Sequence, residues 1–434
     1  MRQMKDSGIE WIGEIPESWK VLFAFQCFSQ VKNKNEGLSE TNLLSLSYGK
    51  LKRKSMDTTE GLLPESFESY NIIEANDIVL RLTDLQNDHT SLRVGLSEER
   101  GIITSAYVTL RNYSKNVPKY LYYYLHSYDI AKGFYGMGAG VRQGLNWEGL
   151  KHLKMLAPTP QEQQKISTYL DRQCGLIDNV IEKTKASIEE YKKLRQAVIT
   201  QAVTKGVRGD RPMKDSGIER IEKIPSEWSE LKMKYFMYIR ARLGWKGLKA
   251  DEYVDEGYIF IGTPNIDDRG NIDWINVNYI TKERYDESPE IMLSEGDVLL
   301  TKDGAGIGKC AYIDKLPSEA TPNGSLAVIT CNELMKGKYL FYYLKSYYFQ
   351  KYIDQIKAGM GVPHLFQGDL REITIAVPSI EEQLEITEYL DKKCAEIDSL
   401  ITKKEQFLTE LDTYKKSLIY EYVTGKKEVP QNEC

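Results

Sequence analysis

The chain has 434 residues, of which 41% are hydrophobic, and its formal net charge is −5. Its mean hydropathy is −0.46, and it has no apolar run near the roughly twenty residues that a membrane span needs, so we expect no membrane partner. Its six scattered cysteines form no CxxC pair and it has only four histidines, which argues against a metal site or a disulfide framework. We expect a soluble cytoplasmic protein without a secretory signal.

The negative net charge does not exclude a nucleic-acid partner. What matters for such binding is how basic residues cluster locally, because phosphate contacts are made by individual side chains. If a chain with this charge balance binds DNA, we expect its affinity to be modest alone and a partner protein to contribute.

The sequence repeats itself in a fixed order. The tag MKDSGIEWIGEIPESW begins at Met4 and returns as MKDSGIERIEKIPSEW at Met213, and a long segment beginning PTPQEQQKI at Pro158 returns as PSIEEQLEI at Pro378. A doubled protein predicts a doubled target, and the unlike regions between tag and long segment predict that the two targets differ. We divide the chain into a tag completing a circular repeat (1–19), a first variable domain (20–157), a central helix (158–212), a second tag (213–228), a second variable domain (229–377) and a C-terminal helix (378–434).

Each long segment carries a heptad pattern. Apolar or heptad-compatible residues recur at alternating steps of four and three, which is typical of a helix that pairs with another helix. Each helix is about 40 residues and therefore roughly 60 Å long. The seam is polar at 184/404 and 195/415, and we expect Leu194 and Tyr414 to cover the latter position. The seam positions are 170, 174, 177, 181, 184, 188, 191, 195, 198 and 202, and the same numbers plus 220.

Helices of this length cannot bury a seam alone, so we expect the two to pair, and a twofold relation between the repeats makes the pairing antiparallel. The alternative is that each helix packs only on its own globular region. The variable domains mix short strands, as at DIVLRL (77–82) and DVLLTK (297–302), with short tyrosine-rich helices near Tyr120 and Tyr339. The predicted fold is therefore α+β: two α/β globular domains separated by two long antiparallel coiled-coil helices, with a pseudo-twofold internal repeat.

The tyrosine-rich helices have two interpretations. Tyrosines can stack on bases, but in YLYYYL they occupy all sides of a short helix, which favours a core role. The segment DGAGIGKC (303–310) resembles a phosphate loop but lacks the first glycine and the Ser or Thr of that motif. We expect instead a glycine-rich turn that brings Lys302, Asp303 and Lys309 near DNA.

Three further segments offer candidate DNA contacts. The loop RLTDLQND presents side chains of the kinds that pair with base edges, and a glycine-rich turn before each long helix adds others. The sharpest basic cluster is YGKLKRKS, for which a solvated loop and a phosphate clamp are both open. The candidates are Arg81, Thr83, Asp84, Gln86 and Asn87 in the loop, Arg142, Gln143 and His364 in the turns, and Lys50, Lys52, Arg53 and Lys54 in the basic cluster.

No catalytic signature is present in the sequence. It has no Asn-Pro-Pro-aromatic motif, no HExxH and no Ser/His/Asp arrangement, and its carboxylates are most simply solvated faces of helices. The chain reads as a non-catalytic binding protein with no metal and no cofactor of its own.

Taken together, the doubled tag, the sequence NWEGLKHLKMLAPTPQEQQKI with its partner FQGDLREITIAVPSIEEQLEI, and the segments DIVLRLTDLQND and DVLLTKDGAGIGKCAYID resemble the specificity subunit of type I restriction-modification systems. The resemblance covers essentially the whole chain. It implies that each variable domain is a target-recognition domain reading one half of a split DNA site, and that the paired helices set the gap between the halves.

The resemblance also implies partners. Two methyltransferase subunits would dock and supply S-adenosylmethionine chemistry on adenine, and motor-nuclease subunits would bring ATP, Mg²⁺ and cleavage, while this chain remains the non-catalytic subunit of the complex. The rival interpretation is a coiled-coil protein–protein adaptor with two unlike binding domains, which shares the helices and the repeat.

Overall fold

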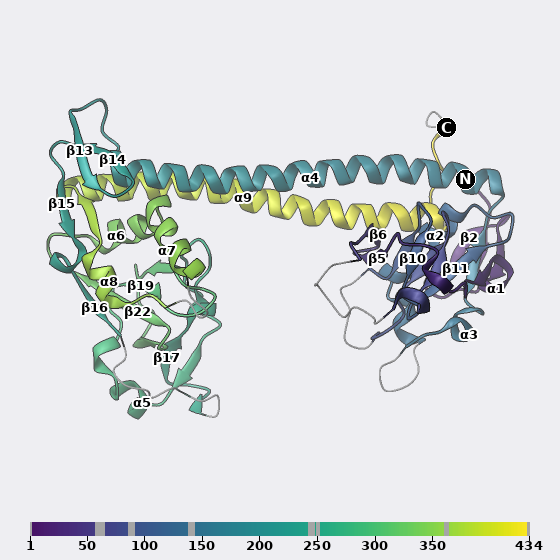
Figure 1. Cartoon of the computed structure of the whole chain (residues 1–434), viewed down its shortest axis with the longest axis horizontal. Coiled ribbons are helices and arrows are strands. Elements are labelled where there is room, and N and C mark those ends of the chain that lie inside the picture. The colour runs from purple at the N-terminus through teal and green to yellow at the C-terminus, as the bar shows by residue number, and fades with distance from the viewer. Residues whose placement is uncertain are drawn as a thin grey trace. The chain divides into compact units, whose positions relative to one another are not determined.

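The computed structural model describes residues 2–56, 66–85, 92–137, 144–241, 248, 252–359 and 364–431. The chain forms two compact units: unit 1 is Met1–Thr184 with Gln406–Cys434, and unit 2 is Lys185–Glu405. Two long helices, α4 (Pro160–Lys205) and α9 (Ile380–Val423), contribute residues to both units (Figure 1). The expected combination of mixed α/β regions with long helices is confirmed.

The two long helices pair in each unit. In unit 1 the rings of Tyr169 and Tyr422 lie 4.6 Å apart, and Asp178 contacts Lys415. In unit 2 Lys404 Nζ lies 5.6 Å from the centre of the Tyr191 ring, and further along α4 a contact joins residues 195 and 398. Residues later in α4 contact residues earlier in α9, so the paired segments run antiparallel within each unit.

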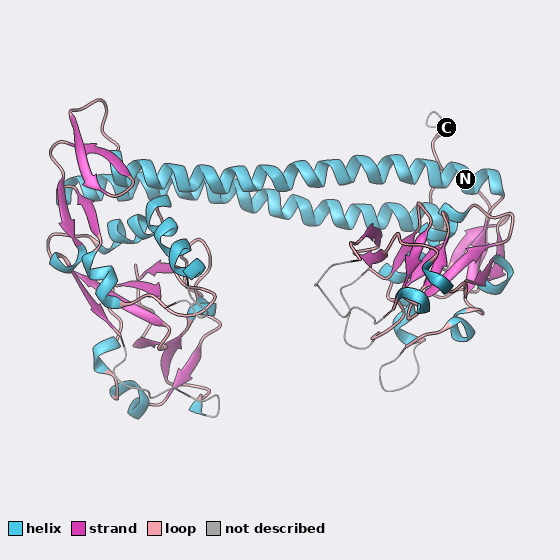
Figure 2. Cartoon of the chain, viewed as in Figure 1, coloured by secondary structure: helices cyan, strands magenta, loops and turns pink. Residues whose placement is uncertain are grey.

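Beside its parts of the long helices, unit 1 contains short antiparallel strands and short helices (Figure 2). A four-stranded sheet has the order β4-β11-β8-β9, and β10-β7, β5-β6 and β12-β3 form two-stranded pairs. The elements are β3 (Lys20–Phe23), α1 (Ala24–Cys27), β4 (Phe28–Gln30), β5 (Leu44–Ser47), β6 (Lys50–Arg53), β7 (Asn71–Ile73), β8 (Ile78–Leu80), β9 (Val94–Leu96), β10 (Gly101–Ile103), β11 (Val108–Asn112), α2 (Pro118–Ile130), α3 (Trp147–Leu150) and β12 (Lys154–Ala157).

Unit 2 has a four-stranded sheet of order β16-β22-β19-β20, a three-stranded sheet of order β18-β17-β21 and the pair β15-β23. Its elements are β15 (Ser229–Lys232), β16 (Met237–Arg240), β17 (Tyr258–Ile261), β18 (Asn278–Ile280), α5 (Lys282–Asp286), β19 (Val298–Thr301), β20 (Cys310–Tyr312), β21 (Ala320–Pro322), β22 (Leu326–Cys331), α6 (Gly337–Leu344), α7 (Tyr347–Gly359), α8 (Gln367–Glu372) and β23 (Thr374–Val377).

The central sheets of the two units correspond. In unit 1, β11 lies between β4 and β8, and β8, the strand of DIVL, lies between β11 and β9. In unit 2, β22 lies between β16 and β19, and β19, the strand of DVLL, lies between β22 and β20. The strands β8 and β19 are buried along their whole length, because each lies inside its sheet and packs on an apolar cluster at both faces. Two otherwise unlike sequences therefore present the loop after β8 and the loop after β19 at the same place in the fold.

The tyrosine-rich helices are core, as the sequence favoured. Tyr120 of α2 and Tyr339 of α6 are fully buried, and each hydroxyl donates to a carbonyl near the end of a long helix, Val423 at 3.0 Å and Val203 at 3.2 Å. Burial of the ring with a satisfied hydroxyl stabilises the fold and leaves no face for base stacking.

The tags are β-hairpins packed at helix ends: β1 (Met4–Asp6) with β2 (Glu14–Pro16), and β13 (Met213–Ile218) with β14 (Ile221–Pro225). In unit 1 the first tag contacts the end of α9, since Lys426 Nζ donates to Glu14 O at 2.6 Å and Tyr420 to Trp11 O at 3.3 Å. The circular order of the repeat predicts this neighbour, although tag and helix end lie at opposite ends of the sequence.

The expectation that Leu194 and Tyr414 cover the polar seam positions 195 and 415 was wrong. Leu194 is 47% exposed and Tyr414 is 57% exposed, so neither apolar neighbour closes the seam. Instead Arg195 and Lys415 stay at the seam and pair with carboxylates of the facing helix. A charge can occupy a helix seam when an opposite charge compensates the loss of water.

One buried histidine predicts how stability depends on pH. Burial is the main cause that lowers the pKa of His126 from 6.5 to about 4, and the positive charges of Lys415 and Lys416 lower it further. Between these two values the unfolded chain binds a proton that the folded chain does not bind, so stability is complete above pH 6.5 and is lost as the pH falls towards 4.

We expect the free energy of unfolding to fall by about 2–3 kcal/mol between pH 7 and pH 4.5, measured by urea titration. His126→Gln should remove most of this slope. An unchanged slope in that variant would contradict the assignment.

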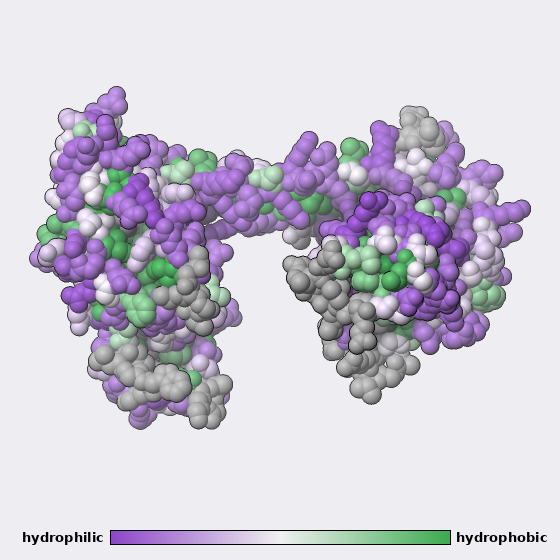
Figure 3. Space-filling view, viewed as in Figure 1, coloured by the Kyte–Doolittle hydropathy of each residue, from purple (hydrophilic) through white to green (hydrophobic). Residues whose placement is uncertain are grey.

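Among the described residues, no helix has both the length and the apolar character needed to cross a membrane. In the view of Figure 3 hydrophilic side chains cover most of the visible surface, and hydrophobic ones form small patches.

Candidate nucleic-acid interface

One buried arginine fixes the backbone of the loop that follows β8. Arg93, just before β9, is fully buried, and its guanidinium donates to three backbone carbonyls of the loop: Arg81 at 3.0 Å, Thr83 at 2.8 Å and Asp84 at 3.3 Å. Asp84 has a positive φ of 55°, a conformation that such carbonyl contacts help to fix. The loop therefore has a defined shape, with the Thr83 side chain exposed and those of Arg81 and Asp84 half-buried.

Arg93 is itself positioned by α2 and by the turn after it. Its backbone N–H donates to Asp129 Oδ2 at 2.7 Å, and its Nε donates to the Tyr135 hydroxyl at 3.2 Å. A buried guanidinium with several acceptors is stable where a lone buried charge is not, because each donor replaces a lost water contact.

The same backbone junction occurs in both units. In unit 1 the N–H of Leu145, at the end of the glycine-rich turn, donates to Leu82 O at 2.9 Å. In unit 2 the N–H of Leu365 donates to Lys302 O, also at 2.9 Å. The two donors are 220 positions apart in the sequence, and so are the two acceptors. Each unit thus joins the loop after its central strand to the end of its glycine-rich turn.

In unit 2 this junction brings three predicted residues together. Lys302 Nζ lies 2.7 Å from Asp303 Oδ2, and the other oxygen of Asp303 contacts His364 Nδ1. Burial would raise the pKa of the Asp303 carboxyl, but hydrogen bonds from Lys302 and His364 outweigh it and hold the pKa below its usual value. The cluster presents an ionised acceptor between two nitrogen donors, and it is about a third exposed at Asp303 and His364.

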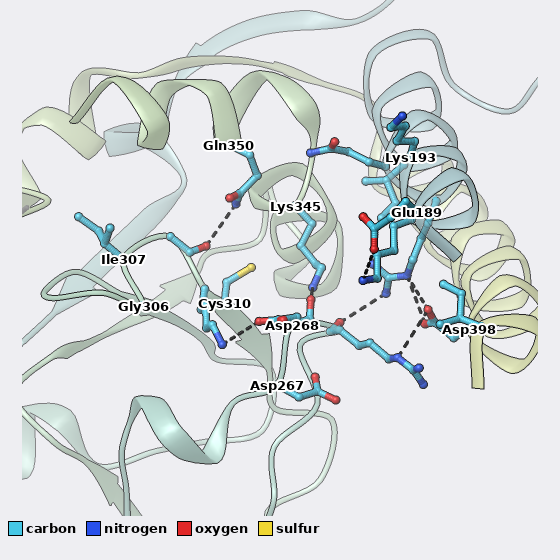
Figure 4. Close-up of a pocket in the computed structure, with 18 of the residues that line it drawn as sticks. Glu189, Lys193, Asp267, Asp268, Gly306, Ile307, Cys310, Lys345, Gln350 and Asp398 are labelled. Carbon is cyan, nitrogen blue, oxygen red and sulfur yellow. Dashed lines mark hydrogen bonds and ion pairs between the residues drawn. The ribbon is translucent and has the colours of Figure 1, made fainter. Parts of the chain in front are cut away.

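Lys309 lies elsewhere. Its Nζ pairs with Asp268 Oδ1 at 2.7 Å, in a pocket of about 790 Å³ within unit 2 whose wall includes α4, α9 and the loop before β20 (Figure 4). Lys345 also points into this pocket and donates to Asp268 O at 2.8 Å. Lys309 therefore pairs with Asp268 and does not join the cluster of Lys302, Asp303 and His364, and its contact with DNA stays a prediction.

The segment DGAGIGKC is the loop of an antiparallel hairpin between β19 and β20. A phosphate loop leads from a strand into a helix, so the topology excludes that interpretation, as the sequence did. Gly308 is required here, because its φ is +88° and a Cβ would lie 2.7 Å from Ile353.

The basic cluster is a strand and not a loop. Lys50, Lys52 and Arg53 lie on β6, which pairs with β5 through a tight turn at Tyr48 and Gly49, where both residues have positive φ. Such a turn fits the right-handed twist of a hairpin, and Gly49 adopts its positive φ without steric cost.

The cluster's side chains differ in what they contact. Lys52 and Lys54 are exposed, and Lys50 is exposed with its Nζ 3.8 Å from Asp178. Arg53 Nε donates to Glu99 Oε1 at 2.8 Å, and this pairing raises the pKa of the already basic guanidinium. Lys52 and Lys54 are the members best placed to meet a phosphate.

Four predicted residues lie outside the described part of the chain: Gln86, Asn87, Arg142 and Gln143. They remain predictions. The sequence interpretation missed Arg93, whose signal is an arginine inside the otherwise apolar strand sequence LRVGL.

Comparisons with known proteins give a consistent picture. Residues 252–410 match the family model described as the type I restriction modification DNA specificity domain. The type I restriction enzyme MjaVIII specificity subunit of Methanocaldococcus jannaschii is 25% identical over 420 residues, which cover 95% of this chain and 93% of that protein. A putative MjaX specificity subunit of the same organism is 25% identical over 96% of this chain and 95% of its own length.

A solved structure described as the basis of complex assembly and conformational transition of the type I R-M system has the same fold. It matches with a TM-score of 0.70 at 14% identity, over 95% of this chain and 99% of the other. The matches confirm the resemblance that the sequence motifs indicated.

Proposed function

We infer from these matches that the chain belongs to the specificity subunits of type I restriction-modification systems. We propose that it reads a bipartite, asymmetric DNA site, with the domain of residues 20–157 on one half and that of residues 229–377 on the other. The observation that carries the proposal is the junction repeated in both units, at Leu82–Leu145 and Lys302–Leu365. The two domains share one backbone arrangement at this junction but carry different side chains there. Recognition of two different half-sites requires such a difference.

The long helices provide the spacer in this proposal. We take α4 and α9 as an antiparallel coiled coil that relates the two repeats by a pseudo-twofold axis. The heptad pattern over both helices and the antiparallel contacts within each unit support it. Two readers joined by a stiff element recognise half-sites at a fixed separation, as dimeric DNA-binding proteins do.

Side chains divide into base readers and phosphate contacts. We propose that Arg81, Thr83, Asp84, Gln86, Asn87, Arg142 and Gln143 in the first domain, and Lys302, Asp303 and His364 in the second, face base edges. Arginine suits guanine, the amides suit adenine and a carboxylate suits cytosine. Lys50, Lys52, Arg53 and Lys54 would contact phosphates, with Lys52 and Lys54 favoured by their exposure.

Chemistry belongs to the partners in this account. DNA and other subunits of the system are the partners, and we propose two methyltransferase subunits, one for each repeat, together with motor-nuclease subunits. S-adenosylmethionine, ATP and Mg²⁺ would be held by those subunits. Their basic surfaces would also supply backbone contacts that a chain of net charge −5 lacks.

The test is co-expression with the methyltransferase in a host that lacks adenine modification. Mapping of modified adenines should give one asymmetric motif of two halves, and the methyltransferase alone should give none. Modification that does not depend on this chain would favour the protein–protein adaptor.

Base readers and phosphate contacts should respond differently to substitution. We expect Arg81→Ala to weaken binding at particular base pairs of one half-site by roughly tenfold, since a bidentate contact contributes about 1–3 kcal/mol of discrimination. Lys52→Ala should weaken binding to all sequences alike and reduce the slope of affinity against salt by about one counterion. Fluorescence anisotropy on single-base variants over a salt series distinguishes the two, and a uniform loss from both would show the readers to be misassigned.

A further inference from the structure

A carboxylate of the long helices meets two cations at corresponding places in both units. In unit 2 it is Asp398 of α9, which lies against Arg195 of α4, with Arg195 Nε 3.1 Å from Asp398 Oδ1 and 3.2 Å from Oδ2. The second cation is Arg269, at the tip of a small hairpin of the second recognition domain, whose Nε lies 3.9 Å from Asp398 Oδ1. The tip is tied to the same helices again, since Arg269 Nη1 donates to Thr402 Oγ1 at 3.0 Å and Arg195 Nη2 donates to Arg269 O at 3.4 Å.

Unit 1 has the same arrangement with different residues. Asp178 of α4 lies 2.5 Å from Lys415 Nζ of α9, through its Oδ1. Its Oδ2 lies 3.8 Å from Lys50 Nζ, which follows the turn of the β5–β6 hairpin of the first recognition domain.

The helix residues correspond and the hairpin residues do not. Asp178 and Asp398, and likewise Arg195 and Lys415, are 220 positions apart in the repeat. Lys50 and Arg269 come from hairpins that differ in sequence and in pairing. Two unlike domains thus deliver a cation to the same helix position, which is hard to explain by the packing of either domain alone.

In unit 2 the hairpin tip also reaches the recognition loop. Asp268, beside Arg269, pairs with Lys309 at the end of the glycine-rich loop and accepts from Lys345 (Figure 4). A displacement of the tip from the helices would therefore move the loop that starts at Asp303. The unit 2 cluster is also the less exposed one: 14% at Arg195, 19% at Asp398 and 33% at Arg269, against 72% at Lys50.

We propose that Asp178 and Asp398 are positioning residues that hold each recognition domain at one place on the helix pair, and so fix the gap between the half-sites. The inference rests on the proposed function. The physical reason is that a partly buried carboxylate left without its cations is costly, so neither a slip of the helices nor a shift of the hairpin is tolerated. Apolar seam residues alone define register less sharply, because they accept any apolar neighbour.

The test uses the full chain with its methyltransferase and a DNA library in which two fixed half-sites are separated by gaps of every length. Three variants address unit 2. Asp398→Asn removes the negative charge that faces both cations. Arg269→Ala removes the cation of the hairpin, with its contacts to Asp398, Thr402 and Glu405. The exchange Arg195→Asp with Asp398→Arg keeps opposite charges between the helices but sets two positive charges against each other at the hairpin. Glu410→Gln, at an exposed carboxylate of the same helix, is the control.

The parent should enrich one gap length. We expect Arg269→Ala and the exchange to lower the preference for that gap over its neighbours by roughly fivefold, as loss of a partly exposed charge pair implies, while the control keeps it. Lys50→Ala should act in the same direction but more weakly, since it is more exposed. Arg269 is on the domain surface, so this variant carries the test if Asp398→Asn does not fold.

A gap preference unchanged in folded Arg269→Ala and in the exchange overturns the inference and leaves the proposed function standing. A parent that enriches no bipartite site overturns both.

Discussion

Replacing Arg93 by methionine is expected to abolish the reading of one half-site and to leave the other intact. Methionine is of similar length but offers no donor, so the carbonyls of Arg81, Thr83 and Asp84 lose the guanidinium that now satisfies them. Buried groups left unpaired in this way cost about 3–5 kcal/mol, which is enough to collapse the loop and to lower the stability of unit 1.

The measurement is binding of the complex to duplexes in which either half-site is scrambled. With Arg93→Met, scrambling the half read by the first domain should no longer matter, whereas scrambling the other half should still abolish preference. Arg100→Met is the matched control, because Arg100 is about half exposed and pairs only at the surface with Glu40 and Glu74. A folded Arg93→Met protein that still reads both halves would show that Arg93 does not shape the reading loop.

Lengthening both long helices by one heptad is expected to move the recognised half-sites apart. Seven residues inserted after Thr184 and seven after Glu405 add about 10.5 Å to each helix while the seam pattern is kept. At about 3.4 Å for each base pair this is roughly three base pairs. Three base pairs also turn the duplex by about 100°, since a full turn takes 10–10.5 pairs, so affinity for the parental site should fall at least tenfold.

A gap-length library measures this directly. The lengthened protein should prefer a gap about three base pairs longer, or bind every gap weakly if it cannot follow the rotation of the duplex. The same insertion in α4 alone shifts one seam against the other and should abolish selective binding. Retention of the parental gap by the doubly lengthened protein would rule out the helices as the spacer.

Much of the architecture could be predicted because its sequence patterns occur twice. The heptad seam, the tags and the buried tyrosines each follow from a local pattern that occurs twice, and helix pairing is the simplest way to bury such a seam. The four-strand order of the central sheets could not be predicted, because sheet pairing depends on contacts between distant strands that short apolar runs do not specify.

The site was predictable only in part. The sequence pointed to the loops at Arg81 and Asp303, because polar groups follow a buried strand there. It placed Lys309 and Asp303 on one glycine-rich turn, but it could not show that the Lys309 side chain pairs with Asp268, since side-chain direction in a glycine-rich hairpin loop is not set by spacing alone. It missed Arg93, because a single arginine inside the apolar sequence LRVGL does not by itself indicate that its guanidinium is buried and binds backbone carbonyls. It also expected Leu194 and Tyr414 to close a seam that ion pairs occupy.

The central claim is that one chain reads two unlike half-sites at one fixed separation. The most direct measurement offers random duplex DNA to this protein in complex with its methyltransferase and sequences the bound pool. The account predicts two short unlike motifs at a single spacing. An intact complex that binds in a salt-sensitive way but enriches no sequence would contradict it and leave only non-specific DNA contact.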